Sequence, residues 1–390
     1  MLLLNVNIIG QEDLKHIHIE GGKIKSIASN EKLLPSNLSG EHLYFNGALA
    51  FPGLINSHDH LDFDLFPHTG NRIYKSYTEW GADIQSNNRK SIDAILSIPK
   101  EIRIQWGVYK NLLSGITTVV NHGEWLNLDK PVINIFQDCY SLHSLAGDRS
   151  WKLKLNRPFV ENQPFVIHAG EGTDKISVEE INELIRWNLF KRKLVAVHGV
   201  SMNAQQAKAF EALIWCPASN EFLYGKTAAI DILKHKTAIL FGTDSTLTAS
   251  WNIWDQLRLA RNKNLVTDAE LFDMLNVIPA KIWNMNEIGQ VANDHWADIV
   301  IAKQKDTIGR WDSFYNLNPE NLLLILHHGN IRLFDAELFD QVKENNISTT
   351  EFSNIYINGI GKYVLGDLPG LIQEIRKYKP DTSFPVEFDS

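Results

Sequence analysis

The chain has 390 residues, of which 44% are hydrophobic and 22% charged, and its formal net charge is -8. A chain of this length and composition can bury a large core, and we expect one large domain with a smaller one beside it. The negative charge, without any basic run, argues against nucleic acid or an anionic membrane surface as a partner. No apolar stretch approaches the ~20 residues that are needed to span a bilayer.

The first 27 residues lack the charged start and the small-residue cleavage site of a secretory signal, and their alternating pattern predicts strands of the mature fold. We therefore expect a cytoplasmic protein. The two cysteines, Cys139 and Cys216, lie in apolar surroundings far apart in the sequence. This placement predicts neither a disulfide framework nor a cysteine zinc site, and both are expected to be small buried hydrophobic residues.

From about residue 48, short apolar runs alternate with longer amphipathic stretches, which is typical of βα units around a parallel sheet. Two helix starts have capping-box spacing, Ser177 with Glu180 and Thr267 with Glu270. The pattern predicts a (β/α)8 TIM-like barrel over residues 48–287, with its site at the carboxyl ends of the strands. The eight predicted strands are 48–58, 115–123, 131–136, 140–145, 164–172, 193–200, 212–217 and 237–245.

The two ends of the chain have a different pattern, with short strands separated by Gly and Asn turns. Residues 1–47 and 288–340 are expected to pair into one small β-sandwich domain that flanks the barrel. Residues 341–390 form a C-terminal extension, in which "GLIQEIRKY" (370–378) predicts a helix.

Polar side chains follow most of the predicted barrel strands. His58 and His60 in "FPGLINSHDHLD" are two residues apart, so on a strand they would point to one place; the alternative is two surface histidines at the start of a loop. Each of the other polar residues also has a structural explanation when taken alone. Together they should converge at one mouth, where imidazole and carboxylate groups suit zinc or iron(II). These other residues are His122, His143, His168, Glu171, His198 and Asp244.

At this point the sequence resembles the amidohydrolase superfamily, and within it the branch of the triazine hydrolases, cytosine deaminase and guanine deaminase. The resemblance covers about residues 45–285. The motifs that carry it are "PGLINSHDH", "GITTVVN", "IHAGE", "VAVHG", "WCPASNEFLYG" and "FGTDS".

The resemblance implies a site with one divalent metal, zinc or iron(II). His58, His60, His168 and Asp244 would bind the metal, and Asp244 would also accept a proton from the attacking water. A metal lowers the pKa of bound water towards ~7, which provides hydroxide at neutral pH. His198 would hydrogen-bond this water or the substrate, and Glu171 would carry a proton to the leaving group. Two-metal relatives use a carboxylated lysine after the fourth strand, where this chain has no lysine before Lys152.

Substrate contacts are less well defined by the sequence. Tyr77 and Trp80 lie in a long segment after the first barrel strand, and they either stack on a flat ring or form that loop's own small core. His122 and His143 either face the substrate or fix loops by hydrogen bonds. Asn220 either caps the following helix or faces the pocket. "VANDHWADIV" departs from the family's usual turn before the last sandwich strand, which weakens any substrate inference from close relatives.

These observations predict a metal-dependent hydrolase that acts on carbon–nitrogen bonds other than peptide bonds and deaminates an amino-substituted heterocycle. A hydrolase of cyclic amides or imides, or a chlorohydrolase, would use the same site. A third hypothesis is an inactive barrel that serves as a binding protein. The expected partner is a small-molecule substrate, and a homodimer is the default for a soluble enzyme.

Overall fold

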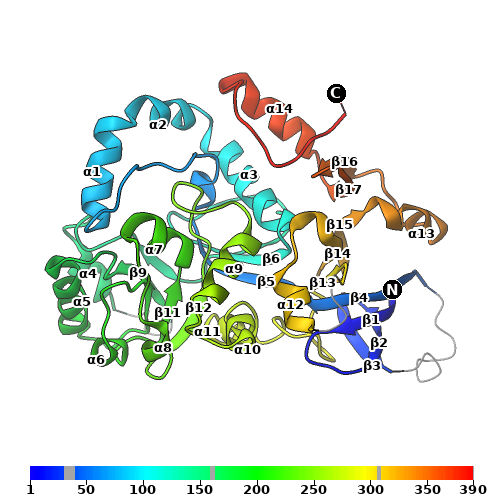
Figure 1. Ribbon diagram of the computed structural model, residues 1–390, viewed down its shortest axis with the longest axis horizontal. Helices are drawn as coiled ribbons and strands as arrows, with labels where there is room; N and C mark the ends of the chain where they lie inside the picture. The colour runs from blue at the N-terminus through cyan, green and yellow to red at the C-terminus, as the bar shows by residue number, and fades with distance from the viewer. Residues whose placement is uncertain (30–39, 159–162, 305–308, 390) are drawn as a thin grey trace.

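The structure is a computed structural model that describes residues 1–29, 40–158, 163–304 and 309–389 (Figure 1). Its helices cover the parallel strands on one side of the view, and a large sheet built from both chain ends lies on the other side. The helices are α1 (Tyr77–Asn87), α2 (Arg89–Leu96), α3 (Lys100–Leu113), α4 (Trp151–Leu155), α5 (Lys175–Trp187), α6 (Ala204–Ala207), α7 (Pro217–Tyr224), α8 (Ile230–Leu233), α9 (Ile253–Asn262), α10 (Asp268–Asp273), α11 (Val277–Ile282), α12 (Arg310–Tyr315), α13 (Phe339–Glu344) and α14 (Leu368–Tyr378). Among the described residues, none of these helices combines the length and the apolar composition that crossing a bilayer requires.

Two parallel sheets form the centre of the molecule within the described residues. A three-stranded sheet has the order β5-β6-β7, and a five-stranded sheet has the order β12-β11-β10-β9-β8. Seven of these strands lie inside the segments predicted for them, and β5 extends one residue beyond its segment, to Asp59, so the α/β prediction with parallel strands is confirmed. The strands are β5 (Leu54–Asp59), β6 (Ile116–Asn121), β7 (Asn134–Phe136), β8 (Tyr140–Leu142), β9 (Phe165–Ala169), β10 (Leu194–His198), β11 (Ala212–Trp215) and β12 (Ala238–Phe241).

Most of these parallel strands are buried on both faces, which explains their nearly continuous apolar sequences, whereas β7 and the start of β8 are only partly buried. Val166 and Val195 belong to a cluster whose buried members come mostly from the parallel strands. The residues next to them along the chain, Ile167 and Leu194, belong to the cluster that also contains Ile181 of α5. His168 follows Val166 by two residues, so strand alternation directs its side chain to the same face as Val166.

The strands of the two chain ends pair with each other, as predicted. Among the described residues they make one nine-stranded sheet, in the order β16-β17-β15-β14-β13-β4-β1-β2-β3, in which β4 pairs with β1 on one side and β13 on the other. The expected β-sandwich and the domain boundaries stay predictions. The strands are β1 (Leu2–Ile8), β2 (Leu14–Glu20), β3 (Lys23–Ala28), β4 (His42–Pro52), β13 (Ile299–Ala302), β14 (Leu322–His327), β15 (Asn330–Asp335), β16 (Phe352–Ile357) and β17 (Ile360–Leu365).

The sequence prediction placed only a helix in the C-terminal extension, and that helix is present as α14. The structure adds the hairpin β16–β17, which continues the sheet of the chain ends through β15. In Figure 1 this part of the chain lies beside α3. The tyrosine hydroxyl of Tyr109 on α3 donates a hydrogen bond to Leu365 O at 3.0 Å.

One of the two predicted capping boxes is wrong. Helix α10 is capped by Thr267, and Glu270 completes the box as predicted. Helix α5 begins earlier than the sequence pattern indicates, because the carboxylate of Asp174 accepts the hydrogen bond from Ser177 N at 2.8 Å and takes the capping position. Glu180 therefore lies inside the helix, where it serves no cap.

Candidate metal centre

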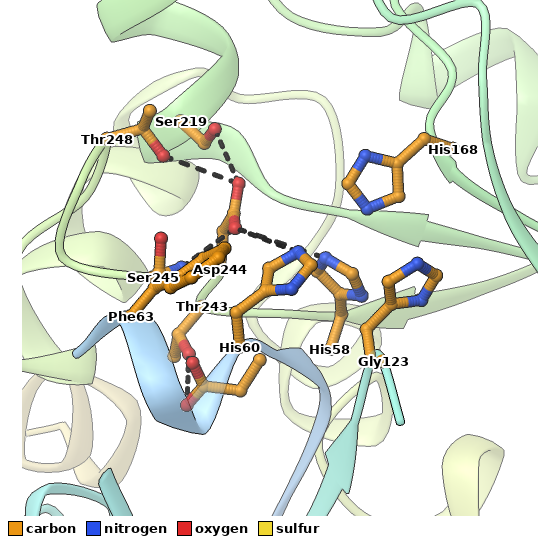
Figure 2. Close-up of polar contacts among 12 residues, drawn as sticks. His58, His60, Phe63, Gly123, His168, Ser219, Thr243, Asp244, Ser245 and Thr248 are labelled. Carbon is orange, nitrogen blue, oxygen red and sulfur yellow. Dashed lines mark hydrogen bonds and ion pairs between the residues drawn. The ribbon is translucent and has the colours of Figure 1, made fainter. Parts of the chain in front are cut away.

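Histidines from three strands meet at the carboxyl end of the parallel sheets, and Figure 2 shows His58, His60 and His168 among them. The ring centroid of His58 lies 4.9 Å from that of His60 and 5.0 Å from that of His168, and the rings of His168 and His198 are 4.8 Å apart. All four are buried. The register between β5 and β6 shifts between Asn56 and Asp59, and such an irregularity re-aims side chains at the end of a strand.

Asp244, which follows β12, brings a carboxylate to these rings. Its Oδ1 lies 3.9 Å from Nε2 of both His58 and His60, and its Oδ2 lies 3.8 Å from Nε2 of His198. The backbone φ of Asp244 is +56°, a left-handed value that is uncommon outside glycine and is often found at functional sites. This turn also brings Asp244 N within 3.0 Å of His58 O, to which it donates a hydrogen bond.

Three hydrogen bonds orient the Asp244 carboxylate, and Figure 2 shows them as dashed lines. Ser219 Oγ donates to Oδ2 at 2.8 Å, Thr248 Oγ1 donates to the same oxygen at 3.3 Å, and Ser245 N donates to Oδ1 at 2.8 Å. Burial acts to raise the pKa of Asp244, but the neighbouring histidines and the Ser219 hydroxyl lower it below its ordinary value. The carboxylate is therefore ionised at neutral pH.

Several imidazole nitrogens at this point are buried without a hydrogen-bond partner among the described residues: both nitrogens of His58 and the Nε2 atoms of His122, His168 and His198. Buried polar atoms normally have partners, so this group needs an explanation. Burial, reinforced by the neighbouring histidines, lowers the pKa values of His58 and His168 well below the ordinary value. Both rings are therefore neutral at pH 7 and can offer a lone pair to a cation.

The donor atoms fit a divalent metal ion. They form overlapping groups in which one atom from each residue lies within 4.8 Å of the others: His58 with His60 and His168, His58 with His198 and Asp244, and His168 with Glu171 and His198. Imidazole and carboxylate ligands suit zinc and iron(II). The four ligands expected from the sequence, His58, His60, His168 and Asp244, are thus gathered at one place.

Glu171 lies between two of these histidines. Its Oε2 is 2.9 Å from Nδ1 of His168, and its Oε1 is 3.6 Å from Nε2 of His198. The hydroxyl of Tyr224 donates to Oε1 at 3.1 Å. Tyr224 was not identified from the sequence, because its position in "NEFLYG" carries no signal that its hydroxyl would reach the segment after β9.

His198 also has a left-handed backbone, with φ of +71°. Regular alternation would place its side chain on the same face as Ala196, away from the other histidines, and the left-handed residue changes that direction. Asn220 lies inside α7, and its Oδ1 is 2.9 Å from Nδ1 of His198. Asn220 therefore neither caps the helix nor lines the pocket described below, and it fixes which nitrogen of His198 faces Glu171 and Asp244.

His122 was expected as a substrate contact, and the structure brings it to the metal centre itself. Its ring centroid lies 4.9, 5.1 and 4.7 Å from those of His58, His60 and His168. Its Nδ1 is 2.9 Å from Ser141 Oγ, which leaves the unpartnered Nε2 as the free nitrogen. His143 lies farther out and is exposed, with its ring 4.7 Å from that of His168.

A pocket of about 70 Å³ opens beside the centre. Tyr77 and Trp80 both line it. Trp80 also packs against the small buried cluster around Tyr74, so Trp80 belongs both to the pocket wall and to the core of the loop. Trp80 is fixed by a hydrogen bond from Nε1 to Thr69 O at 2.7 Å. The pocket-lining residues are His60, Phe63, Tyr77, Trp80, His143, His168, Glu171, Leu223, Asp244, Ser245, Leu247 and Thr248.

A buried ionic network beneath the histidines was also missed by the sequence reasoning. Lys110 Nζ of α3 lies 2.8 Å from Asp59 Oδ2 and 2.8 Å from Asp64 Oδ1. The amides of Asn56 and Asn111 donate to the same oxygen of Asp59. Because Asp59 stands between His58 and His60, this network fixes the strand end that carries both rings. Only the acidic residue inside "HDH" gave any local signal for it.

The family model for "Amidohydrolase family" matches residues 152–350, which is just over half of the chain. The chain belongs to the amidohydrolase family. As an amidohydrolase it is a hydrolytic enzyme, and the resemblance expected from the sequence motifs is confirmed. The His and Asp groups described above give this amidohydrolase a candidate metal site.

Solved structures with a similar fold include deaminases and a chlorohydrolase. An adenosine deaminase from Xanthomonas campestris with bound zinc has a TM-score of 0.70 and 14% identity, over 88% of this chain and 96% of that one. A guanine deaminase from C. acetobutylicum with bound guanine has a TM-score of 0.61 and 13% identity, over 85% and 99%. An atrazine chlorohydrolase from Arthrobacter aurescens complexed with zinc has a TM-score of 0.64 and 15% identity, over 88% and 99%. No curated protein matches the chain.

Proposed function

We propose that this amidohydrolase deaminates an amino-substituted heterocycle, a small molecule whose sp² carbon carries the leaving nitrogen. The observation that carries the proposal is Glu171, held between His168 and His198 within the group that also contains Asp244. A carboxylate at this place can move a proton between an attacking water and a leaving nitrogen. The similar folds of an adenosine deaminase and a guanine deaminase support the same reaction class.

The proposed metal ligands are His58, His60, His168 and Asp244, and zinc is the metal we propose because two similar structures carry it. When bound, such a metal lowers the pKa of water towards ~7 and supplies a nucleophile at neutral pH. The proposal also takes the two parallel sheets as parts of one (β/α)8 barrel, since the hydrogen bond from Asp244 N to His58 O links the segment after β12 to β5.

The chain's own residues then have separate tasks. Asp244, ionised and oriented by Ser219, Thr248 and Ser245, accepts a proton from the attacking water. Glu171 first accepts a proton as general base and then delivers it to the leaving nitrogen as general acid. Each such transfer is worth about 10²–10⁴ in rate. Nε2 of His198 lies between these two carboxylates and orients the water or the substrate.

The substrate ring would lie in the pocket beside Tyr77 and Trp80, with His143 at its outer edge. His122 is placed so close to the ligand histidines that we assign it to the inner wall of the site, beside the metal. Asn220 acts indirectly, by holding the ring of His198.

A second reaction class has its own support. The fold is also similar to that of an atrazine chlorohydrolase, and the same site could attack a carbon–chlorine bond or a cyclic amide or imide. The products separate these reactions, because deamination releases ammonia, whereas the alternatives release chloride or open a ring.

The test is Glu171→Gln, with Glu179→Gln as the matched control on the nearby exposed face of α5. Metal content is measured by elemental analysis, and ammonia and chloride release are measured with adenosine, guanine and atrazine as probes. We expect Glu171→Gln to keep the metal of the wild type and to lose about 10²-fold or more in turnover. Glu179→Gln should match the wild type in both. Unchanged turnover in Glu171→Gln would refute the role of this carboxylate.

A further inference from the structure

A second cluster of potential metal ligands lies at the other end of β5 from the histidines of the metal centre. Asp298 precedes β13, His327 ends β14, and His328 stands in the turn to β15. The carbonyl oxygen of Asp298 accepts a hydrogen bond at 2.8 Å from the backbone N–H of Gly53, the residue before β5 begins. The cluster therefore sits where the nine-stranded sheet joins the first parallel strand.

The turn between β14 and β15 brings the two histidine rings together. His328 and Gly329 both have left-handed φ values, +49° and +71°, which defines a two-residue hairpin turn of the type that favours Asn-Gly. With this backbone the His328 ring folds back beside that of His327, and their centroids are 4.2 Å apart. Gly329 N donates to Ala297 O at 3.0 Å, which holds the turn against the segment that carries Asp298.

Asp298 provides the carboxylate of the cluster, and one of its oxygens has nothing to bind. Oδ1 is 3.1 Å from Nδ1 of His327 and accepts a hydrogen bond from His328 N at 2.6 Å. Oδ2 is buried and has no hydrogen-bond partner among the described residues. Water cannot easily take that place, because only 2% of the Asp298 side chain is exposed. A buried carboxylate oxygen without a donor is unfavourable, so this atom points to a missing cation or donor.

We propose that Asp298, His327 and His328 bind a transition-metal ion, as a second metal site separate from the metal centre. One ligand atom from each residue lies within 4.8 Å of the others. Two imidazoles and one carboxylate suit Zn²⁺, Co²⁺ or Ni²⁺ better than Ca²⁺ or Mg²⁺, which prefer oxygen ligands. His328 is the most exposed of the three, so water can complete the coordination from the solvent side.

A metal ion here would act on the fold. It would tie the start of β13 to the β14–β15 hairpin and, through the hydrogen bond to Gly53, to the start of β5. Binding to the native chain alone stabilises it in proportion to the logarithm of the metal concentration over Kd. Arg332 is the competing cation: burial lowers the pKa of its guanidinium below the ordinary value, and the nearby charge of Asp298 partly opposes this shift.

The variant that tests the site is His328→Asn. It removes one ligand, yet asparagine suits the left-handed turn position, so the variant should fold at least as well as the wild type when no metal is present. Asp298→Asn is the second variant, and the control is His295→Ala, at a partly buried histidine beside Trp296. None of these residues belongs to the metal centre.

Metal-free protein is titrated with Co²⁺, and the bound equivalents are counted by equilibrium dialysis. We expect two equivalents in the wild type and in His295→Ala, and at least tenfold weaker binding of one of them in His328→Asn and Asp298→Asn. In EDTA, the thermal unfolding midpoint of His328→Asn should be no lower than that of the wild type. Added Co²⁺ should raise the midpoint of the variant by less than it raises that of the wild type. Trp296, whose ring lies 4.4 Å from that of His328, gives an independent fluorescence signal that Trp296→Phe should abolish.

If the wild type binds only one equivalent, and His328→Asn does not change it, the second site does not exist and Arg332 or water satisfies Asp298. An identical Co²⁺ stabilisation in His328→Asn and the wild type would also overturn it. A failure of the proposed deaminase activity can be distinguished from a failure of the second metal site, because the first would leave the two bound Co²⁺ equivalents unchanged.

Discussion

Glu180 is a carboxylate whose surroundings give it an unusual pKa. It lies on α5, one wall of a cavity of about 380 Å³ that is also lined by Tyr77, Trp151 and two further glutamates. Burial, followed by the nearby charge of Glu171, raises the pKa of Glu180 from 4.5 to about 7. Its proton is therefore held at pH values where an ordinary glutamate has lost it.

This shift predicts a pH-dependent stability that Glu180→Gln should remove. Between pH 4.5 and 7 the native state keeps a proton that the unfolded state releases, so stability falls as the pH rises through this window. The full effect is at most about 3 kcal/mol, and partial exposure of the side chain reduces it. The urea midpoint of Glu180→Gln minus that of the wild type should be larger at pH 8 than at pH 4.5. The prediction is contradicted if the difference between Glu180→Gln and the wild type is the same at both pH values. It is also contradicted if Glu179→Gln shows the same pH-dependent change.

Single residues differ in how far the sequence could predict them. His58, His60 and His168 were identified because each follows an apolar strand, and the end of a parallel strand is where a site forms. Lys110 and Ser219 were not, since a lysine in an amphipathic helix and a serine after a proline are ordinary on a surface. Their roles depend on contacts with residues far along the chain, Asp59 and Asp244, which only the folded structure reveals.

The close approach of β12 to β5 depends on a residue without a side chain. A Cβ atom added to Gly242 would lie 2.7 Å from His58 Cβ and 2.8 Å from Ile214 Cγ2. Such distances require one of the neighbours to move, and His58 Cβ is fixed to the backbone of β5. The glycine of "FGTDS" is thus a packing requirement of the metal centre.

We expect Gly242→Ala to displace His58 and so to lower both stability and metal affinity. Overpacking of this kind costs about 1–3 kcal/mol. The matched control is Gly81→Ala in α1, where an added Cβ meets nothing within 4 Å and should stabilise the helix by about 0.5–1 kcal/mol. Urea midpoints and metal content by elemental analysis measure the two effects. If Gly242→Ala binds metal as tightly as the wild type, β5 and β12 can separate without disturbing His58.

Whole elements were predicted well where their signal was local. Most of the eight parallel strands are apolar runs, although β8 is half polar, and Thr267 with Glu270 is a true capping box. The hairpin β16–β17 was missed although Asn358-Gly359 separates two alternating runs, which is a strong hairpin signal. The box at Ser177 was wrong because Asp174, three residues earlier, competes for the same backbone N–H.

The C-terminal segment connects to the metal centre through helix α3. Its Phe384 packs edge-on against Trp106 of α3, with ring centroids 4.7 Å apart. The indole of Trp106 in turn donates to Asp64 O at 2.9 Å, and the carboxylate of Asp64 binds Lys110. No sequence pattern predicts this connection, since Phe384 and Trp106 lie far apart along the chain.

We expect Trp106→Ala to lower the free energy of unfolding by about 3–5 kcal/mol, because a large buried side chain is lost and Asp64 O loses its donor. Phe384→Ala should cost less, because Phe384 is only partly buried. In a double-mutant cycle measured by urea unfolding, the two should couple by about 0.5–1.5 kcal/mol, the range for a pair of aromatic rings. The matched control is Phe388→Ala, which lies near Arg376 like Phe384 but has no ring contact with Trp106 in the described residues. Equal coupling of Trp106 to both phenylalanines would mean that the segment docks as a whole and that the ring pair does not determine its position on α3.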